Sequence, residues 1–422
     1  MSLLSYRSDW SEMLRYWRKD LLAGIAVGIV ALPLALGFAI TTGAPASAGL
    51  STAIIAGFVA ALFGGSNFQV SGPTGAMTVV LVPIVSKYGL SSLLPLGIIA
   101  GLLIIAMSLL RLGRYVDSVP WEVMEGFTLG IAIIIAFQQI PLIFQVAKVG
   151  GTHTIPAAVE TIRFAISHPI KWISLALALS SLILKRSWPR ITRALKIPFH
   201  IPGSIVAVIV ATSVTQLLHL DLARIGNLPR TLSFTFDFSL PSIPLASLIY
   251  SALVIAMLGA IESLLSARVA DGLARSTISH EESKHDSNKE LFGQGLATIA
   301  AVCSGGLPAT GAIARTSVNV RAGARTRLAA IIHSIFLLLV VLAFAPIVSV
   351  IPTAALAGIL VGTSLRIANP RSVKEALQAT TKVRIVYVVT AVAVVGIDLI
   401  WGTLIGILLH LVLRRMPVRS GN

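Results

Sequence analysis

One short pattern occurs twice in this chain, and it interrupts an apolar segment each time. The first copy has Gly64-Gly65 before Gly72-Pro73-Thr74-Gly75-Ala76, and the second has Gly305-Gly306 before Pro308-Ala309-Thr310-Gly311-Ala312. The two threonines are about 236 residues apart, and a Gly-Leu-x-Thr sequence precedes both copies. Glycine and proline clusters at membrane depth are tolerated only where the backbone is buried in protein or lines a cavity. Each copy therefore predicts a broken membrane span.

A broken span leaves the start of a short helix inside the protein. Free N–H groups and a partial positive charge point out of such a start. We expect one short helix to begin at Thr74 and the other at Thr310, each after a brief extended stretch. Two helix starts that face each other would form a site for an anion.

The composition places the chain in a membrane. Of its 422 residues 55% are hydrophobic and 12% are charged, with a mean hydropathy of +0.89. These values are typical of a polytopic membrane protein. The 33 Lys and Arg residues outnumber 17 Asp and Glu, which in a soluble chain would favour a nucleic-acid partner. Between hydrophobic spans the same excess marks cytoplasmic loops instead, so we expect no nucleic acid.

Apolar segments divide the chain into two sets of seven spans. The first set is expected near 20–41, 47–64, 74–86, 92–112, 118–140, 170–185 and 202–219, and the second near 244–267, 290–304, 310–321, 327–346, 352–365, 384–400 and 401–415. A repeat with an odd number of spans enters the membrane in the opposite direction the second time, so the halves would be inverted repeats. Residues 1–19 read as an interfacial helix, and residues 231–238 alternate like a strand.

The basic residues predict the sidedness of these spans. They gather on one side of the predicted spans, which places both termini in the cytoplasm of a cell whose inner membrane the chain crosses many times. Cys303 should then lie close to the outer end of its span. Because it is the one cysteine, an intrachain disulfide is excluded.

No motif for catalysis is found. The chain lacks the phosphate-binding loop, the zinc-binding His-Glu pattern and the nucleophile elbow, so we expect neither an enzyme nor a cofactor. A metal at His280, His285 and Asp286 is conceivable, but a solvated loop is the preferred interpretation. Transport would have to use ion gradients.

Two charged residues lie at membrane depth beside the broken segments. Arg315 follows the second start by a few residues, where its charge would attract an anion; a structural role, paired or reaching the interface, is the alternative. Glu262 lies in the preceding span. Its carboxylate could carry a proton, bind a cation such as sodium, or balance the charge of Arg315.

These residues resemble the sulfate permease (SulP) family of anion transporters. The resemblance covers about residues 18–370. It rests on Leu32-Pro33 through Phe38, Ala61-Leu62-Phe63-Gly64-Gly65, Gly72-Pro73-Thr74, Ile261-Glu262-Ser263, Asn288-Lys289-Glu290-Leu291, residues 305–311 and residues 315–326.

The resemblance implies an all-α fold of fourteen spans, in which a core moves against a gate. The core would comprise about residues 20–112 and 244–346, and the gate about 118–219 and 352–415. It implies that an anion is bound by Phe38, Thr74, Gly75, Ala76, Thr310, Gly311, Ala312, Ile313 and Arg315. Glu262 would couple transport to a cation. A homodimer is compatible with the family.

Some positions depart from the family pattern. Many members have a glutamine where this chain has Leu34, and serines where it has Ala312 and Ala314. The pocket would therefore bind its anion mainly through backbone N–H groups. Members also carry a cytoplasmic STAS domain, which is expected to be absent from these 422 residues.

These observations together predict a proton-coupled symporter of a small oxyanion or carboxylate, such as sulfate, bicarbonate or fumarate. An uncoupled exchanger or channel is the alternative. A nucleobase transporter of related fold would leave Arg315 unexplained.

Overall fold

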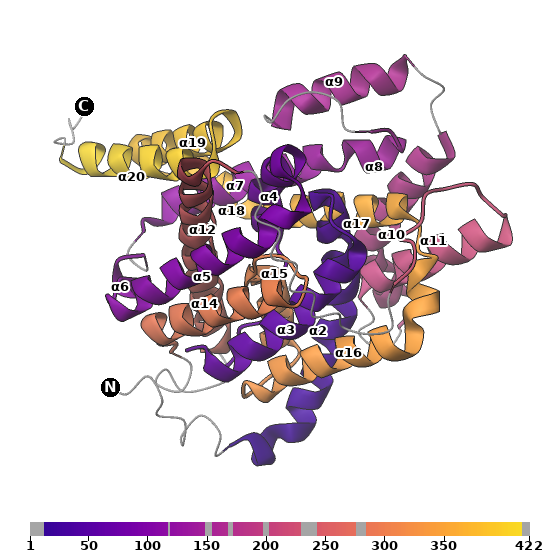
Figure 1. Cartoon of the computed structure of the whole chain (residues 1–422), viewed down its shortest axis with the longest axis horizontal. Coiled ribbons are helices and arrows are strands. Elements are labelled where there is room, and N and C mark those ends of the chain that lie inside the picture. The colour runs from indigo at the N-terminus through magenta and orange to yellow at the C-terminus, as the bar shows by residue number, and fades with distance from the viewer. Residues whose placement is uncertain are drawn as a thin grey trace.

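Helices make up almost all of this chain. The computed structural model describes residues 12–116, 119–147, 154–167, 172–196, 202–228, 243–275 and 284–415 (Figure 1). The first half contains α2 (Met13–Thr42), α3 (Ala46–Phe63), β1 (Ser71–Gly72), α4 (Gly75–Tyr88), η1 (Leu90–Ser92), α5 (Leu93–Leu109), α6 (Gly113–Val116), α7 (Trp121–Gln138), α8 (Ile140–Phe144), α9 (Thr154–Ile166), α10 (Trp172–Ala194) and α11 (Gly203–Leu217). The second contains α12 (Leu245–Ala274), α14 (Ser287–Cys303), β2 (Thr310–Gly311), α15 (Ile313–Arg321), α16 (Leu328–Ser349), α17 (Thr353–Ile367), α18 (Pro370–Gln378), α19 (Thr381–Gly396) and α20 (Leu399–Arg415).

The all-α architecture with two short broken helices is confirmed. Every predicted span has a helix at its position, although several helices are longer than expected. α2 begins at Met13 as one continuous helix, and α12 runs on to Ala274. The predicted strand at 231–238 and most of the predicted interfacial helix lie outside the described residues.

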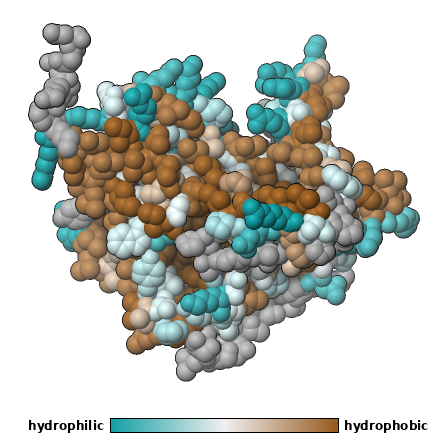
Figure 2. Space-filling view, turned by 90° about the horizontal axis from the view of Figure 1, so that it is seen from above, coloured by the Kyte–Doolittle hydropathy of each residue, from teal (hydrophilic) through white to brown (hydrophobic). Residues whose placement is uncertain are grey.

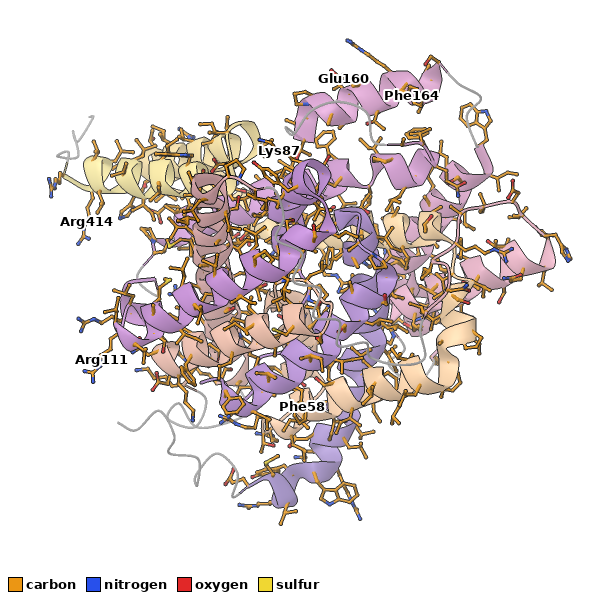
Figure 3. All side chains as sticks on the ribbon, in the orientation of Figure 1. Phe58, Lys87, Arg111, Glu160, Phe164 and Arg414 are labelled. Atoms are coloured by element: carbon orange, nitrogen blue, oxygen red, sulfur yellow. The ribbon has the colours of Figure 1, made fainter. Side chains whose placement is uncertain are left out.

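The outer faces of the helices suit a lipid environment. Six helices are long and apolar enough to cross a membrane, and Gly75–Tyr88 and Gly203–Leu217 are shorter apolar helices, all within the described ranges. Large apolar side chains point outward from several helices; for example, Ile347 is 62% exposed. Figure 2 shows apolar surface over a broad area of one face. Figure 3 shows the charged residues Arg111 and Arg414 at the periphery.

The two broken segments meet at the centre of the molecule. β1 and β2 pair antiparallel, with Ser71 opposite Gly311 and Gly72 opposite Thr310. α4 follows β1, and α15 follows β2, so both short helices begin beside this small ladder (Figure 1). The pairing satisfies backbone polar groups that would otherwise be left bare at membrane depth.

The second helix start differs from the prediction. Thr74 caps α4, and its hydroxyl accepts the Met77 N–H, as expected. Thr310, however, does not start α15, which begins at Ile313 after Ala312. Thr310 lies in β2, because its backbone pairs with Gly72 and its side chain is used elsewhere.

Small residues let the two halves approach closely. A side chain at Gly293 of α14 would meet the backbone of Phe63 and Gly64 at the end of α3. A side chain at Gly101 of α5 would meet the Gly295 carbonyl oxygen at 2.7 Å. Close backbone approach at such residues is a common basis of helix packing in membranes. Here it brings α14 close to both α3 and α5.

Candidate functional site

Three oxygen atoms from both halves of the chain meet beside the ladder. The Oε2 atom of Glu262 on α12 lies 2.7 Å from the Thr74 hydroxyl and 2.5 Å from the Thr310 hydroxyl. The two hydroxyl oxygens lie 2.9 Å apart. We call these residues the oxygen triangle. The two threonines that the repeated pattern singled out therefore share one carboxylate.

The oxygen triangle can hold one more hydrogen than its hydroxyls supply. Two threonine hydroxyls carry two hydrogens, but three close contacts join the three oxygens. With Glu262 ionised, only two of these contacts are hydrogen bonds. A proton on Glu262 would complete the third, so this geometry accommodates the neutral acid.

Arg315 lies close by and is enclosed by protein. Its side chain is 1% exposed, and Nη2 donates to the Pro73 carbonyl oxygen at 3.1 Å. Nη1 has no hydrogen-bond partner in the described part of the chain and packs against Gly72. Among the described residues, Arg315 forms no direct salt bridge with Glu262. The guanidinium therefore retains an unused donor in a buried position.

The backbone around the ladder has both used and unused donors. The Gly311 N–H donates to the Ser263 hydroxyl, and the Ala312 N–H donates to the Val70 carbonyl. These two groups are not free for a ligand. The first N–H groups of α4, at Gly75 and Ala76, and of α15, at Ile313, have no intrahelical partner, as at any helix start.

Two apolar side chains cover the start of α4. A side chain at Gly75 would meet the Ile135 side chain of α7 and come within 3.3 Å of the Phe38 ring of α2. Phe38 is 5% exposed and Ile135 is 1% exposed. Phe38 therefore lies beside the start of α4, and its role in binding an anion stays a prediction. Ile135 was not foreseen, because nothing in its apolar run distinguishes it.

A second set of buried polar residues supports the ladder from one side. Glu290 on α14 accepts the Gly65 and Ser66 N–H groups and the Gln69 side-chain N–H, at 2.5 to 2.9 Å. Gln294, one turn later, accepts the Ser71 hydroxyl. Sequence reasoning did not assign roles to these residues. The available signal was that Glu290 lies in the Asn288–Leu291 stretch on which the family resemblance rests.

His333 on α16 is a further buried polar residue near Arg315. It is fully enclosed, and neither ring nitrogen has a hydrogen-bond partner in the described residues. His333 therefore packs inside the protein with two ring nitrogens that are unpaired among the described residues.

The fold and the site define a class of protein. This apolar helical protein contains two helix starts, the buried Arg315 and the carboxylate of Glu262 between two threonines. Such features fit a membrane transporter of anions. The family comparison agrees, because the model of the sulfate permease family matches residues 17–391. The chain belongs to the sulfate permease family.

Several relatives are similar over most of the chain. YvdB of Bacillus subtilis is 37% identical over 429 residues, covering 96% of this chain and 75% of the relative. The bicarbonate transporter BicA of Synechocystis is 35% identical over 404 residues, covering 92% and 68%.

Solved structures share the fold. The transmembrane domain of a cyanobacterial bicarbonate transporter BicA superposes with a TM-score of 0.78 at 32% identity, covering 94% of this chain and 98% of that chain. The structure of SLC26A9 gives 0.83 at 16% identity, covering 98% and 67%, and it supports the fold alone.

Proposed function

We propose that this protein is a secondary active transporter that carries a small anion together with a proton. The anion would bind at the starts of α4 and α15, facing Arg315. The proton would reside on Glu262 of the oxygen triangle. The chain would reside in the inner membrane with both termini in the cytoplasm.

The single observation that carries this proposal is the hydrogen deficit of the oxygen triangle. An ionised Glu262 leaves one of three contacts without a hydrogen, whereas a protonated one completes all three. Thr74 and Thr310 come from opposite halves, so the proton would strengthen the junction between the two broken segments. A group that alternates between charged and neutral in this way is what a coupled transporter needs.

Arg315 gives a reason for anion and proton to bind together. A positive neighbour favours the ionised form of Glu262, and a bound anion would offset that positive charge. Protonation would then become easier when the anion is present. By thermodynamic linkage, each ligand raises the affinity for the other by the same factor.

The substrate class follows from the donors at the site. Few polar side chains are available, and the helix-start N–H groups with the Arg315 Nη1 atom suit a small oxyanion or carboxylate. The family name points to sulfate, and the BicA relatives point to bicarbonate. A dicarboxylate such as fumarate fits the same donors.

Helix packing supports movement of a core against a gate. α2, α3 and α5 pack with α12, α14 and α16, whereas α7, α10 and α11 belong with α17, α19 and α20. The site lies in the first group, and Ile135 of α7 from the second group covers it. Separation of the two groups would uncover the start of α4, as alternating access requires.

Transport into sealed vesicles tests the proposal. Purified protein in proteoliposomes should accumulate radiolabelled sulfate, bicarbonate or fumarate when only an acid-outside pH gradient is applied. Matched vesicles without protein and vesicles with a proton ionophore are the controls. Equilibration of every anion without accumulation would refute proton coupling.

The alternative is an uncoupled exchanger or channel with the same fold. One observation favours it: Glu262 already holds both threonines, so it could serve only to join the two broken segments. In that case the anion would move down its own gradient, and the pH gradient would have no driving effect.

A further inference from the structure

One side chain of the proposed gate covers the start of α4. The Cγ1 atom of Ile135 on α7 lies 2.9 Å from the point where a Cβ atom on Gly75 would stand, and its Cδ1 atom lies closer still. Cα–Cβ bonds in a helix tilt towards its N-terminus, so this point lies beside the free N–H groups of α4. We propose that Ile135 sets the largest anion that the site accepts, and that the substrate is a compact oxyanion such as sulfate or bicarbonate.

Such a size limit, which rests on the proposed anion site, narrows the substrate class. Sulfate, bicarbonate and fumarate all offer oxygen atoms to N–H donors, so the donors alone do not separate them. The three anions differ in size, because fumarate has eight non-hydrogen atoms, sulfate five and bicarbonate four. Ile135 carries three carbon atoms beyond its Cβ. The space that its side chain fills beside α4 is therefore comparable with the difference in size between fumarate and sulfate.

Two apolar side chains line this part of the site, and they belong to different groups of helices. A ring atom of Phe38 on α2 lies 3.3 Å from the same point at Gly75. α2 packs with α4 in the proposed core, so Phe38 keeps its place beside the helix start. Ile135 belongs to the proposed gate, and a bound anion must pass it when the core moves against the gate. Ile135 therefore limits the size of every anion that is carried.

Packing and polar contacts fix the position of Ile135. Its side chain is 1% exposed and shares a hydrophobic cluster with Ala76 and Met77 of α4. One turn beyond Ile135, the Gln139 Oε1 atom lies 3.2 Å from the Thr41 hydroxyl of α2, and the Gln139 side-chain N–H donates to the Ile135 carbonyl at 3.1 Å. A side chain held in this way gives a sharp size limit, because closely packed neighbours yield little.

A series of alkylsulfonates measures the size limit. These anions share one head group and one negative charge, and from methanesulfonate to butanesulfonate they differ by one carbon atom at a time. The full chain in detergent is titrated with each compound in competition with radiolabelled sulfate. We expect the affinity of the parent to fall by about tenfold for each carbon atom beyond the limit, because an extra methylene in a filled apolar site costs about that much.

Shorter side chains at position 135 should move the limit by the number of carbon atoms removed. Ile135→Val should admit sulfonates one carbon atom longer, and Ile135→Ala should admit sulfonates two or three carbon atoms longer. Ile134→Ala is the matched control, because Ile134 is buried on the same helix but points roughly 100° away around its axis. It should keep the limit of the parent. Melting temperatures identify the folded variants, and Ile135→Val suffices if Ile135→Ala does not fold.

The outcomes separate the size limit from the anion site itself. The same limit in the parent, in Ile135→Val and in Ile135→Ala would overturn the role of Ile135 and leave the anion site in place. An equal shift in Ile134→Ala would also overturn it, because the limit would then follow a general loosening of α7. So would uptake of fumarate by parent proteoliposomes at the rate of sulfate uptake. Failure of folded parent protein to bind sulfate or any sulfonate would instead refute the proposed anion site.

Discussion

Replacement of Arg315 tests the electrostatic basis of the anion site. The guanidinium is buried, without a direct carboxylate partner in the described residues, and one of its nitrogens is unused. At an effective dielectric constant of about 20, two unit charges about 5 Å apart interact by about 3 kcal/mol. The helix starts retain a partial positive charge after the replacement. We therefore expect Arg315→Ala to weaken anion binding by roughly 10- to 100-fold.

The nature of the substitution and the anion's charge should both change the effect. Arg315→Lys keeps the charge but loses the donor to the Pro73 carbonyl, so its loss should be smaller. A dianion such as sulfate should lose more affinity than bicarbonate, because the interaction scales with charge. Isothermal titration of detergent-purified protein measures both ratios.

Arg327 supplies the control for a buried arginine. It is also 1% exposed, but it donates to the carbonyl oxygens of Ala61, Leu62 and Gly64 and to the Asn67 side chain. Arg327→Ala should lower the yield of folded protein and the melting temperature, with affinity preserved in the folded fraction. Unchanged affinity in both Arg315 variants would refute the electrostatic argument and return Arg315 to a packing role.

Three further predictions concern the cover, the buried histidine and the topology. Gly75→Ala should weaken anion binding, because its side chain would meet Ile135. Adding Ile135→Val to Gly75→Ala should restore part of the affinity. Unchanged affinity in Gly75→Ala would show that the packing of Ile135 over the start of α4 does not affect binding. His333→Leu should leave the melting temperature equal or higher, because it removes two buried nitrogens without partners, and a drop of more than a few degrees would contradict this. The topology is tested with single cysteines in a Cys303→Ser background, at Lys87 and at Ala322, which are both exposed. A membrane-impermeant thiol reagent applied to right-side-out vesicles should label Lys87→Cys but not Ala322→Cys. Equal labelling of the two variants would exclude the inverted topology.

The sequence was informative about what local composition determines. Apolar segments predicted the helices, and the Gly-Pro-Thr pattern predicted the break before α4, because proline and glycine act on the backbone at their own position. The helix start at Thr310 was predicted wrongly. Ladder pairing between Gly72 and Thr310 joins residues far apart in the chain, and no local signal distinguishes a strand residue from a helix cap there.

The sequence named candidate site residues but not the contacts between them. Thr74, Thr310, Glu262 and Arg315 were selected because charged or hydroxyl side chains are rare beside breaks in apolar segments, whereas Phe38 was named only through the family resemblance. Their arrangement could not be predicted, because it depends on how helices far apart in the chain pack together. In the structure Glu262 bridges the two threonines and does not pair directly with Arg315. Buried glutamines and an apolar cover were missed because their roles depend on tertiary packing alone.

Glu262→Gln tests the central claim most directly. Glutamine is close in shape to the protonated acid and can donate a hydrogen to one threonine oxygen, but it cannot release a proton at working pH. Anion binding should therefore persist in the variant and lose its dependence on pH, while the parent should bind more tightly at acid than at alkaline pH.

The decisive measurement is uptake into proteoliposomes under an acid-outside pH gradient, with parent and Glu262→Gln protein at equal density. The account predicts that the parent concentrates its anion and that the variant only equilibrates it. Accumulation by the variant equal to that of the parent would contradict the account and would place the coupled proton away from Glu262.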